Sequence, residues 1–121
     1  ATEFVQEAGI SVLQKSKVYC EKMKAEFNRR RIFVLKRMRE LGMDPGYTPT
    51  GAFYVFYKYP DSSKSSLDLC HEVLEKTGVA IAPGLDFGAM GEGYIRLSYA
   101  QSMENIDRAL TKLADSKLLT S

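Results

Sequence analysis

The sequence has few of the residues that mark several common classes of protein. It contains two cysteines, one histidine and no tryptophan, and its charges nearly balance, with 17 Lys and Arg against 15 Asp and Glu. Two cysteines are too few for a disulfide framework or a four-cysteine zinc site. A net charge of +2 does not indicate a nucleic-acid or membrane partner, and no apolar run approaches the ~20 residues of a membrane span. We therefore expect a reducing, cytoplasmic setting, no metal, no membrane and no nucleic acid.

What the chain does have is the size and composition of one domain. Its 121 residues are 45% hydrophobic and 26% charged, which is enough to bury one modest core. The sequence opens at Ala1 without an initiator methionine. We expect from this that the chain was excised from a longer protein.

Helical patterns occupy the first third of the sequence. Residues 1–15 carry a loose apolar pattern that Gly9 interrupts, typical of one or two short helical pieces. Residues 16–41 form the clearest helix, and Gly42 and Pro45 follow its end. Its apolar stripe consists of Tyr19, Met23, Phe27, Val34, Met38 and Leu41. Such a helix is about 39 Å long, so it must overhang the domain or run along another body.

The remaining sequence predicts three strands and two further helices. The strands are expected at 52–57, 79–82 and 94–99. The helices begin after Ser65 or Ser66 and after Ser102, and the first carries Leu67, Cys70, Val73 and Leu74 inward and ends at Gly78. Loops are expected at 58–66 and 84–93, and the tail after Asp115 is expected to fray. This order predicts an α/β (α+β) two-layer sandwich: a small three-stranded sheet with helices on one face, preceded by a long helix.

Arg96 is the sharpest candidate for a binding function. Its neighbours Ile95 and Leu97 face a core, so Arg96 projects from the opposite face of the strand. A guanidinium group keeps its charge and offers a planar fork that fits a carboxylate or a phosphate. In the preceding loop, glycines allow close backbone approach, and the apolar Phe87 would be unusual in a purely solvated loop. An ordinary arginine on a solvated sheet face is the alternative.

The other polar residues point to structure more than to chemistry. Arg29, Arg30 and Arg31 spread around a helix and are diluted by glutamates, so ion pairs are expected there. His71 is expected to face solvent, Cys20 and Cys70 to be core thiols, and Asp86 to cap a loop. Because no nucleophile, base or metal set is present, the sequence does not contain a complete active site.

Three segments carry a resemblance to a known family. They are PTGAFYV at 49–55, GVAIAPGLDFG at 78–88 and GEGYIRLSYA at 91–100. In order and at compatible spacing, they resemble the C-terminal part of class I/II aminotransferases, fold-type I pyridoxal-phosphate enzymes that include aspartate aminotransferase. The segment FNRRR at 27–31 is similar to a turn of the family's long inter-domain helix.

The resemblance implies that this chain is one domain of a two-domain enzyme. Residues 1–15 would be a remnant of the linker from the large domain, and 16–121 would be the small domain. Arg96 would bind the α-carboxylate of an amino-acid or 2-oxo-acid substrate. The residues implied to line the cleft are Gly51, Phe53, Gly84, Phe87 and Ser98.

The missing part is implied to carry the chemistry. The Schiff-base lysine and the other pyridoxal-phosphate-binding residues of the family belong to the large domain. We therefore expect no catalytic residue and no cofactor in this chain, which should be inactive alone. The parent enzyme would be a homodimer that transfers an amino group between an amino acid and a 2-oxo acid.

Several alternatives stay open. The family includes lyases on the same scaffold, and the resemblance does not select one amino-acid substrate. A second hypothesis is a free-standing module that binds a small carboxylate or phosphate through Arg96 and residues 83–93. A third is nucleic-acid binding by the arginine-rich helix.

Overall fold

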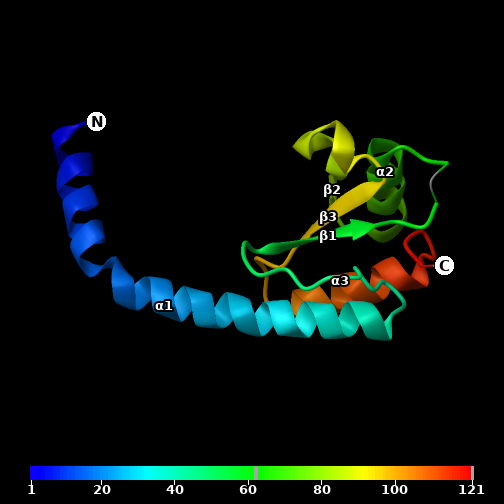
Figure 1. The fold of residues 1–121 in the computed structure, drawn as a ribbon, viewed down its shortest axis with the longest axis horizontal. Helices are drawn as coiled ribbons and strands as arrows, with labels where there is room; N and C mark the ends of the chain where they lie inside the picture. The colour runs from blue at the N-terminus through cyan, green and yellow to red at the C-terminus, as the bar shows by residue number, and fades with distance from the viewer. Residues whose placement is uncertain (62, 121) are drawn as a thin grey trace.

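Three α-helices and three short strands follow one another in the predicted order in the computed structural model, which describes residues 1–61 and 63–120 (Figure 1). They are α1 (Glu3–Glu40), β1 (Tyr54–Lys58), α2 (Ser66–Thr77), β2 (Ala82–Pro83), the 3₁₀ turns η1 (Gly84–Phe87) and η2 (Ala89–Gly91), β3 (Tyr94–Ser98) and α3 (Met103–Asp115). Ser62, inside the predicted polar loop, and Ser121, the last residue of the predicted domain, lie outside the described residues.

α1 is one helix of 38 residues, where the sequence pattern predicts short pieces followed by a separate helix. Gly9 does not end it, because a glycine weakens a helix interior by about 1 kcal/mol without removing a hydrogen bond. The helix is about 57 Å long and bends in its first, blue portion (Figure 1). Its buried side chains, such as Val34 and Met38, all lie near its C-terminal end. The predicted apolar stripe is therefore covered only there, and Tyr19 and Met23 are exposed.

The sheet is antiparallel with strand order β1-β3-β2, so β3 is the central strand. β1 begins at Tyr54, two residues later than predicted, since Ala52 has a left-handed φ of 62° that interrupts the strand. The predicted buried strand at 79–82 is reduced to the edge strand β2 at Ala82–Pro83, and both of its residues are only half-buried. A proline is tolerated at an edge because it has no N–H to donate to a further strand.

The core lies on one face of the sheet. Val55 and Tyr57 of β1, with Ile95 and Leu97 of β3, belong to the same hydrophobic cluster as buried residues of all three helices. The helical members of that cluster are Val34, Leu35, Met38, Leu69, Cys70, Val73, Ile106, Leu110 and Leu113. This arrangement is the predicted two-layer architecture, with helices on one face.

Two predicted packing details are wrong. Leu67 and Leu74 of α2 are exposed, and Leu69 is buried in their place, because the inward stripe runs through positions 66, 69, 70 and 73. The tail does not fray after Asp115. Leu119 is fully buried, and the Tyr57 hydroxyl donates a hydrogen bond to its carbonyl oxygen at 2.8 Å.

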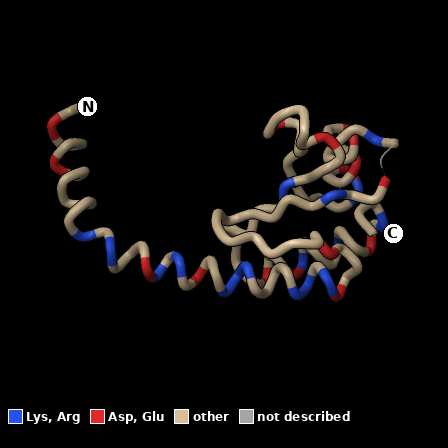
Figure 2. Tube along the Cα trace, in the orientation of Figure 1, with Lys and Arg blue, Asp and Glu red and all other residues tan. Residues whose placement is uncertain are grey.

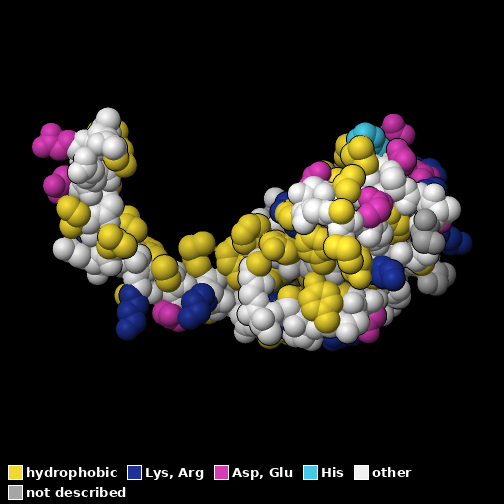
Figure 3. All heavy atoms as spheres, turned by 45° about the horizontal axis from the view of Figure 1, so that its top comes forward, with side chains coloured by type: hydrophobic (Ala, Val, Ile, Leu, Met, Phe, Trp, Pro, Cys, Tyr) yellow, Lys and Arg dark blue, Asp and Glu magenta, His cyan; other side chains and the backbone are white. Residues whose placement is uncertain are grey.

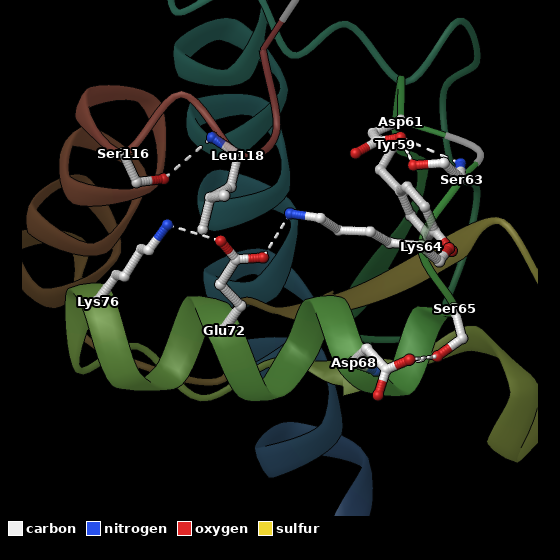
Figure 4. Close-up of polar contacts among 10 residues, drawn as sticks. All are labelled: Tyr59, Asp61, Ser63, Lys64, Ser65, Asp68, Glu72, Lys76, Ser116 and Leu118. Atoms are coloured by element: carbon white, nitrogen blue, oxygen red, sulfur yellow. Dashed lines mark hydrogen bonds and ion pairs between the residues drawn. The ribbon is translucent and has the colours of Figure 1, made fainter.

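Polar contacts cap the start of α2 and join its side to the preceding loop (Figure 4). The Ser65 hydroxyl accepts a hydrogen bond from the backbone N–H of Asp68 at 3.1 Å, as the predicted cap requires. Along the helix, Glu72 lies between Lys64 and Lys76 and accepts a hydrogen bond from each (Figure 4). These lysines, Lys64 first, hold the pKa of Glu72 below its ordinary value. The loop that follows β1 is thereby tied to the side of α2.

Candidate functional site

Arg96 lies in the middle of the central strand, on the face opposite the core. In register, Phe56 of β1 flanks it on one side and Ala82 of β2 on the other. Ile95 and Leu97 are buried on the core face, so the side chains of β3 alternate as the sequence predicts. Since paired strands hold the backbone on both sides, only side-chain torsions can move the Arg96 guanidinium group.

Two aromatic rings hold that guanidinium group. Its central carbon, Cζ, lies 5.4 Å from the ring centre of Tyr54 and 4.8 Å from that of Phe87. Tyr54 comes from β1, and Phe87 comes from η1, which folds over this face of the sheet. Both distances are within the range of a cation–π interaction.

No residue in the described part of the chain accepts a hydrogen bond from Arg96. Its Nε atom is buried and has no hydrogen-bond partner among the described residues, and no ion pair in that part of the chain involves Arg96. Leaving a buried donor unpaired costs about 1–3 kcal/mol. A buried, charged donor of this kind is suited to an acceptor that arrives from outside, and a carboxylate or phosphate matches its planar fork.

Close backbone packing brings η1 to this position. Gly84 is buried, and a Cβ atom at Gly84 would lie 2.6 Å from the carbonyl oxygen of Tyr94 and would also overlap the Gly91 carbonyl. Only a glycine allows the start of η1 to lie this close to the start of β3. From there the chain carries Phe87 to the sheet, where its ring meets that of Phe56 edge-on at 5.2 Å.

The other predicted cleft residues lie at different distances from Arg96. Phe53 is half-exposed and joins the same aromatic row, with ring centres 5.8 Å from Tyr54 and 6.1 Å from Phe27 of α1. Ser98 is exposed, and its hydroxyl donates to the Phe53 carbonyl at 3.4 Å. Gly51 is exposed in open space. Of these predicted residues, Phe87 contacts the guanidinium group and Ser98 shares the face of β3 on which Arg96 lies, whereas Phe53 packs against Phe27 of α1 and Gly51 lies apart.

Sequence reasoning placed the segment from Gly51 to Tyr54 toward the cleft but singled out neither Tyr54 nor Phe56 as a neighbour of Arg96. Tyr54 touches the guanidinium group, and Phe56 supports the ring of Phe87. The signal was available, because side chains two apart on a strand share a face. Only the pairing of β1 with β3, however, places that face beside Arg96.

The arginine-rich part of α1 is occupied by local contacts. The Glu26 carboxylate accepts from Arg29 at 2.9 Å and from Arg30 at 2.8 Å, and these hydrogen bonds, Arg29 first, lower the pKa of Glu26 to about 2. Arg31 donates to the Pro49 carbonyl oxygen at 3.1 Å. Figure 2 shows Lys and Arg positions interspersed with Asp and Glu positions along α1. Arg29 and Arg30 therefore make the predicted ion pairs, and Arg31 anchors the loop that leads to β1.

The histidine and the two cysteines do not form a second candidate site among the described residues. His71 is exposed, as predicted. Cys70 is buried, and burial raises the pKa of its thiol to about 11, but the prediction that Cys20 is a core thiol is wrong because it is exposed on the uncovered part of α1. Within residues 1–61 and 63–120, no three His, Cys, Asp or Glu side chains are grouped to hold a metal ion. None of the described helices has the length and apolar character to cross a membrane.

A surface groove of about 820 Å³ lies away from the guanidinium group. It runs between residues 78–81 and α3, and Val79, Ile81 and Leu110 are among its lining residues. Arg96 is not among them. The guanidinium group therefore lies on the sheet face outside this groove.

Comparisons with known proteins show which proteins the chain is similar to. No protein-family model matches the chain. The aspartate aminotransferase of Pyrococcus horikoshii is 41% identical over 112 residues, which are 91% of this chain and 29% of that protein. The LL-diaminopimelate aminotransferase of Nitratidesulfovibrio vulgaris is 35% identical over 111 residues, 92% of this chain and 28% of that protein.

A solved structure matches in the same way. The aromatic aminotransferase of Pyrococcus horikoshii superposes with a TM-score of 0.84 at 34% identity, covering 94% of this chain and 31% of that one. This chain thus spans less than a third of the length of the relatives it matches. Sequence, fold and the order of the elements together lead to one conclusion: the chain belongs to the aminotransferase family and has the architecture of the small domain of these enzymes.

Proposed function

We propose that this chain is the small domain of a longer, pyridoxal-phosphate-dependent aminotransferase, and that Arg96 binds the α-carboxylate of the amino-acid or 2-oxo-acid substrate. One observation carries the proposal: the Arg96 Nε is buried without a hydrogen-bond partner among the described residues, while two aromatic rings hold the guanidinium group. A fork that is held in one orientation and has a buried donor without an acceptor is complementary to a carboxylate. Both substrates of a transamination carry that group next to the reacting carbon, so one arginine serves both half-reactions.

The contribution of Arg96 is to position the substrate. Two parallel N–H donors on one carboxylate fix both the place and the plane of the substrate's α-carbon. A strand with neighbours on both sides keeps that anchor in place while the rest of the site assembles around it. Arg96 neither gives nor takes a proton, because a guanidinium group stays charged at all working pH values.

The exposed apolar side of α1 is evidence for a contact with another domain. Apolar side chains follow the side of α1 that faces the globular part in Figure 3. The exposed apolar residues of this helix are Phe4, Val5, Ile10, Val12, Leu13, Val18, Tyr19, Met23 and Ile32. Exposed apolar surface of this extent marks an interaction site. We assign it to the large domain of the same chain, with residues 1–15 as part of the inter-domain helix, and the family resemblance supports a homodimeric parent.

Pyridoxal phosphate does not fit the residues of this chain. Its attachment needs a lysine whose amine loses its proton readily in a desolvated pocket. Lys64 donates a hydrogen bond to Glu72, and this contact raises the pKa of Lys64, so its amine holds its proton more firmly. Every other lysine is exposed, so none of them lies in a desolvated pocket, and Lys24, Lys36 and Lys76 are in addition paired with glutamates. We therefore place the cofactor on the part of the enzyme outside this chain and derive no step through it here.

Substitution of Arg96 in the full-length enzyme tests the carboxylate role. Removing one partner of a buried charge pair costs about 2–5 kcal/mol, so Arg96→Ala should lower kcat/KM for amino acids by roughly 30-fold to several thousand-fold. Arg96→Lys keeps the charge but loses the planar fork, so its kcat/KM should lie between that of the wild type and that of Arg96→Ala. Arg108→Ala is a matched control, since Arg108 is an exposed arginine of α3 whose side chain, among the described residues, donates a hydrogen bond to Asn105 and makes no ion pair. A decrease below about threefold for Arg96→Ala would show that Arg96 has another role.

A test on the chain alone separates an enzyme part from a free-standing module. After mixing with pyridoxal phosphate, reduction with borohydride and desalting, the isolated chain should retain no stoichiometric cofactor and should show no transaminase activity. Activity of the chain alone would contradict the proposal. Titration with succinate at low salt then asks whether the sheet face binds a carboxylate without the large domain, as the module hypothesis requires.

A further inference from the structure

The two rings that hold Arg96 leave its donors free. The Arg96 Cζ atom lies over the ring of Phe87, 4.8 Å from its centre, and over the ring of Tyr54, 5.4 Å from its centre. A cation–π contact uses the positive charge and occupies none of the N–H donors. A cation held in this way is oriented but keeps its full capacity to bind an anion.

Arg37 shows the other way in which this fold holds an arginine. Its Nε donates to Asp107 at 2.6 Å, and one terminal nitrogen donates to Glu40 at 3.0 Å. These carboxylates raise the pKa of Arg37, the bond to Glu40 contributing most. An arginine paired in this manner would have to give up a carboxylate before it could bind a substrate. Arg96 avoids that competition because its supports are aromatic.

We propose that Phe87 is a positioning residue for Arg96, assisted by Tyr54, and that it holds the guanidinium group in the plane in which it receives the substrate carboxylate. This inference rests on the proposed carboxylate role of Arg96. Without the rings, the arginine side chain would regain several torsions, and binding would have to restrict them again. The aromatic supports therefore lower the entropic cost of binding without occupying a donor.

The placement of Phe87 is itself built into the fold. Its ring packs edge-on against Phe56, which is the register partner of Arg96 on β1. At the start of η1, Gly84 is locked against the backbone of Gly91 and Tyr94. Nearly half of the Phe87 side chain nevertheless stays exposed, at 48%. A residue with that exposure contributes little to the core, so its anchoring points to a role at the surface it faces.

The experiment compares Phe87→Leu with Phe87→Tyr in the full-length enzyme. Leucine keeps an apolar side chain but has no π-face, and tyrosine keeps the π-face. With Phe87→Leu, KM for the amino acid and for the 2-oxo acid should rise about tenfold, corresponding to about 1.4 kcal/mol of lost binding. The kcat value should stay within about twofold. Phe87→Tyr should match the wild type, and Tyr54→Leu should show a smaller rise in KM because its ring is farther from the Arg96 guanidinium group.

A binding measurement gives a readout without turnover. Calorimetry with 3-phenylpropanoate and with succinate, carboxylates that lack the amino group, should give a Kd about tenfold weaker for Phe87→Leu than for the wild type. Leu85→Ala is the matched control, since Leu85 lies on the same turn with the same 48% exposure and makes no cation–π contact with Arg96. That control should bind like the wild type.

The outcomes separate this inference from the proposal on which it rests. If Arg96→Ala weakens binding but Phe87→Leu does not, the aromatic support is refuted and the carboxylate role stands. If Phe87→Leu lowers kcat and leaves KM unchanged, or if Phe87→Tyr is as weak as Phe87→Leu, the positioning role is also refuted. If Arg96→Ala itself binds both carboxylates normally, the proposed function fails first.

Discussion

The contact between Gly84 and Gly91 makes Gly84→Ala a direct test of how η1 is held. The new Cβ atom would lie 2.6 Å from the Tyr94 carbonyl oxygen and would overlap the Gly91 carbonyl as well. Both obstacles are backbone groups, which cannot rotate away as a side chain can, so η1 has to move off β3. Overpacking of this kind costs about 1–3 kcal/mol. The gain from restricting the unfolded chain is about 0.4–1 kcal/mol, so we expect a net loss of about 1–2 kcal/mol.

Urea unfolding, followed by circular dichroism, measures that loss. With a denaturant dependence of about 2 kcal/mol per molar urea, the midpoint should fall by roughly 0.5–1 M. Gly51→Ala is the matched control, because a Cβ at Gly51 meets no atom within 4 Å and its φ lies outside the left-handed range. Its midpoint should stay or rise slightly. Equal midpoints for the two variants would refute the argument that backbone contact at Gly84 positions the loop.

Two further predictions concern thiol reactivity and acid stability. In the isolated, folded chain, a disulfide reagent such as Ellman's reagent should label the exposed Cys20 at once and the buried Cys70 only after unfolding, because burial raises the pKa of Cys70 to about 11. Equal rates for both thiols would contradict the burial of Cys70. Glu92 accepts hydrogen bonds from the backbone N–H and the hydroxyl of Ser66, and these bonds lower its pKa below the ordinary 4.5. The stability that the ionised Glu92 contributes to the folded chain is therefore fully present above pH 4.5, and it is lost as the pH falls through the lowered pKa of Glu92. The unfolding midpoint of Glu92→Gln should lie below that of the wild type at pH 7 and approach it in acid, and a pH-independent difference would count against the carboxylate.

Local sequence patterns were sufficient to predict features that depend on a single helix or strand. The alternation around Arg96 determines that its side chain leaves the core face, because successive residues of a strand point to opposite sides. Ser65 and Ser102 each cap a helix as predicted, since a cap depends only on residues within one turn. The order of elements, and with it the two-layer architecture, follows from the same short-range periodicity.

Long-range contacts decided the rest. Whether Leu67 or Leu69 faces the core, and whether Leu119 is held, depends on surfaces supplied by distant segments. The strand order β1-β3-β2 brings Tyr54 beside Arg96 across more than 40 residues of sequence, and no local pattern specifies that pairing. An arginine on a sheet face is chemically ordinary until two rings from elsewhere orient it and bury its Nε atom. The residues capable of binding were therefore readable in the sequence, whereas the empty, oriented fork exists only in the folded chain, because it is made of side chains that are neighbours in space and not along the backbone.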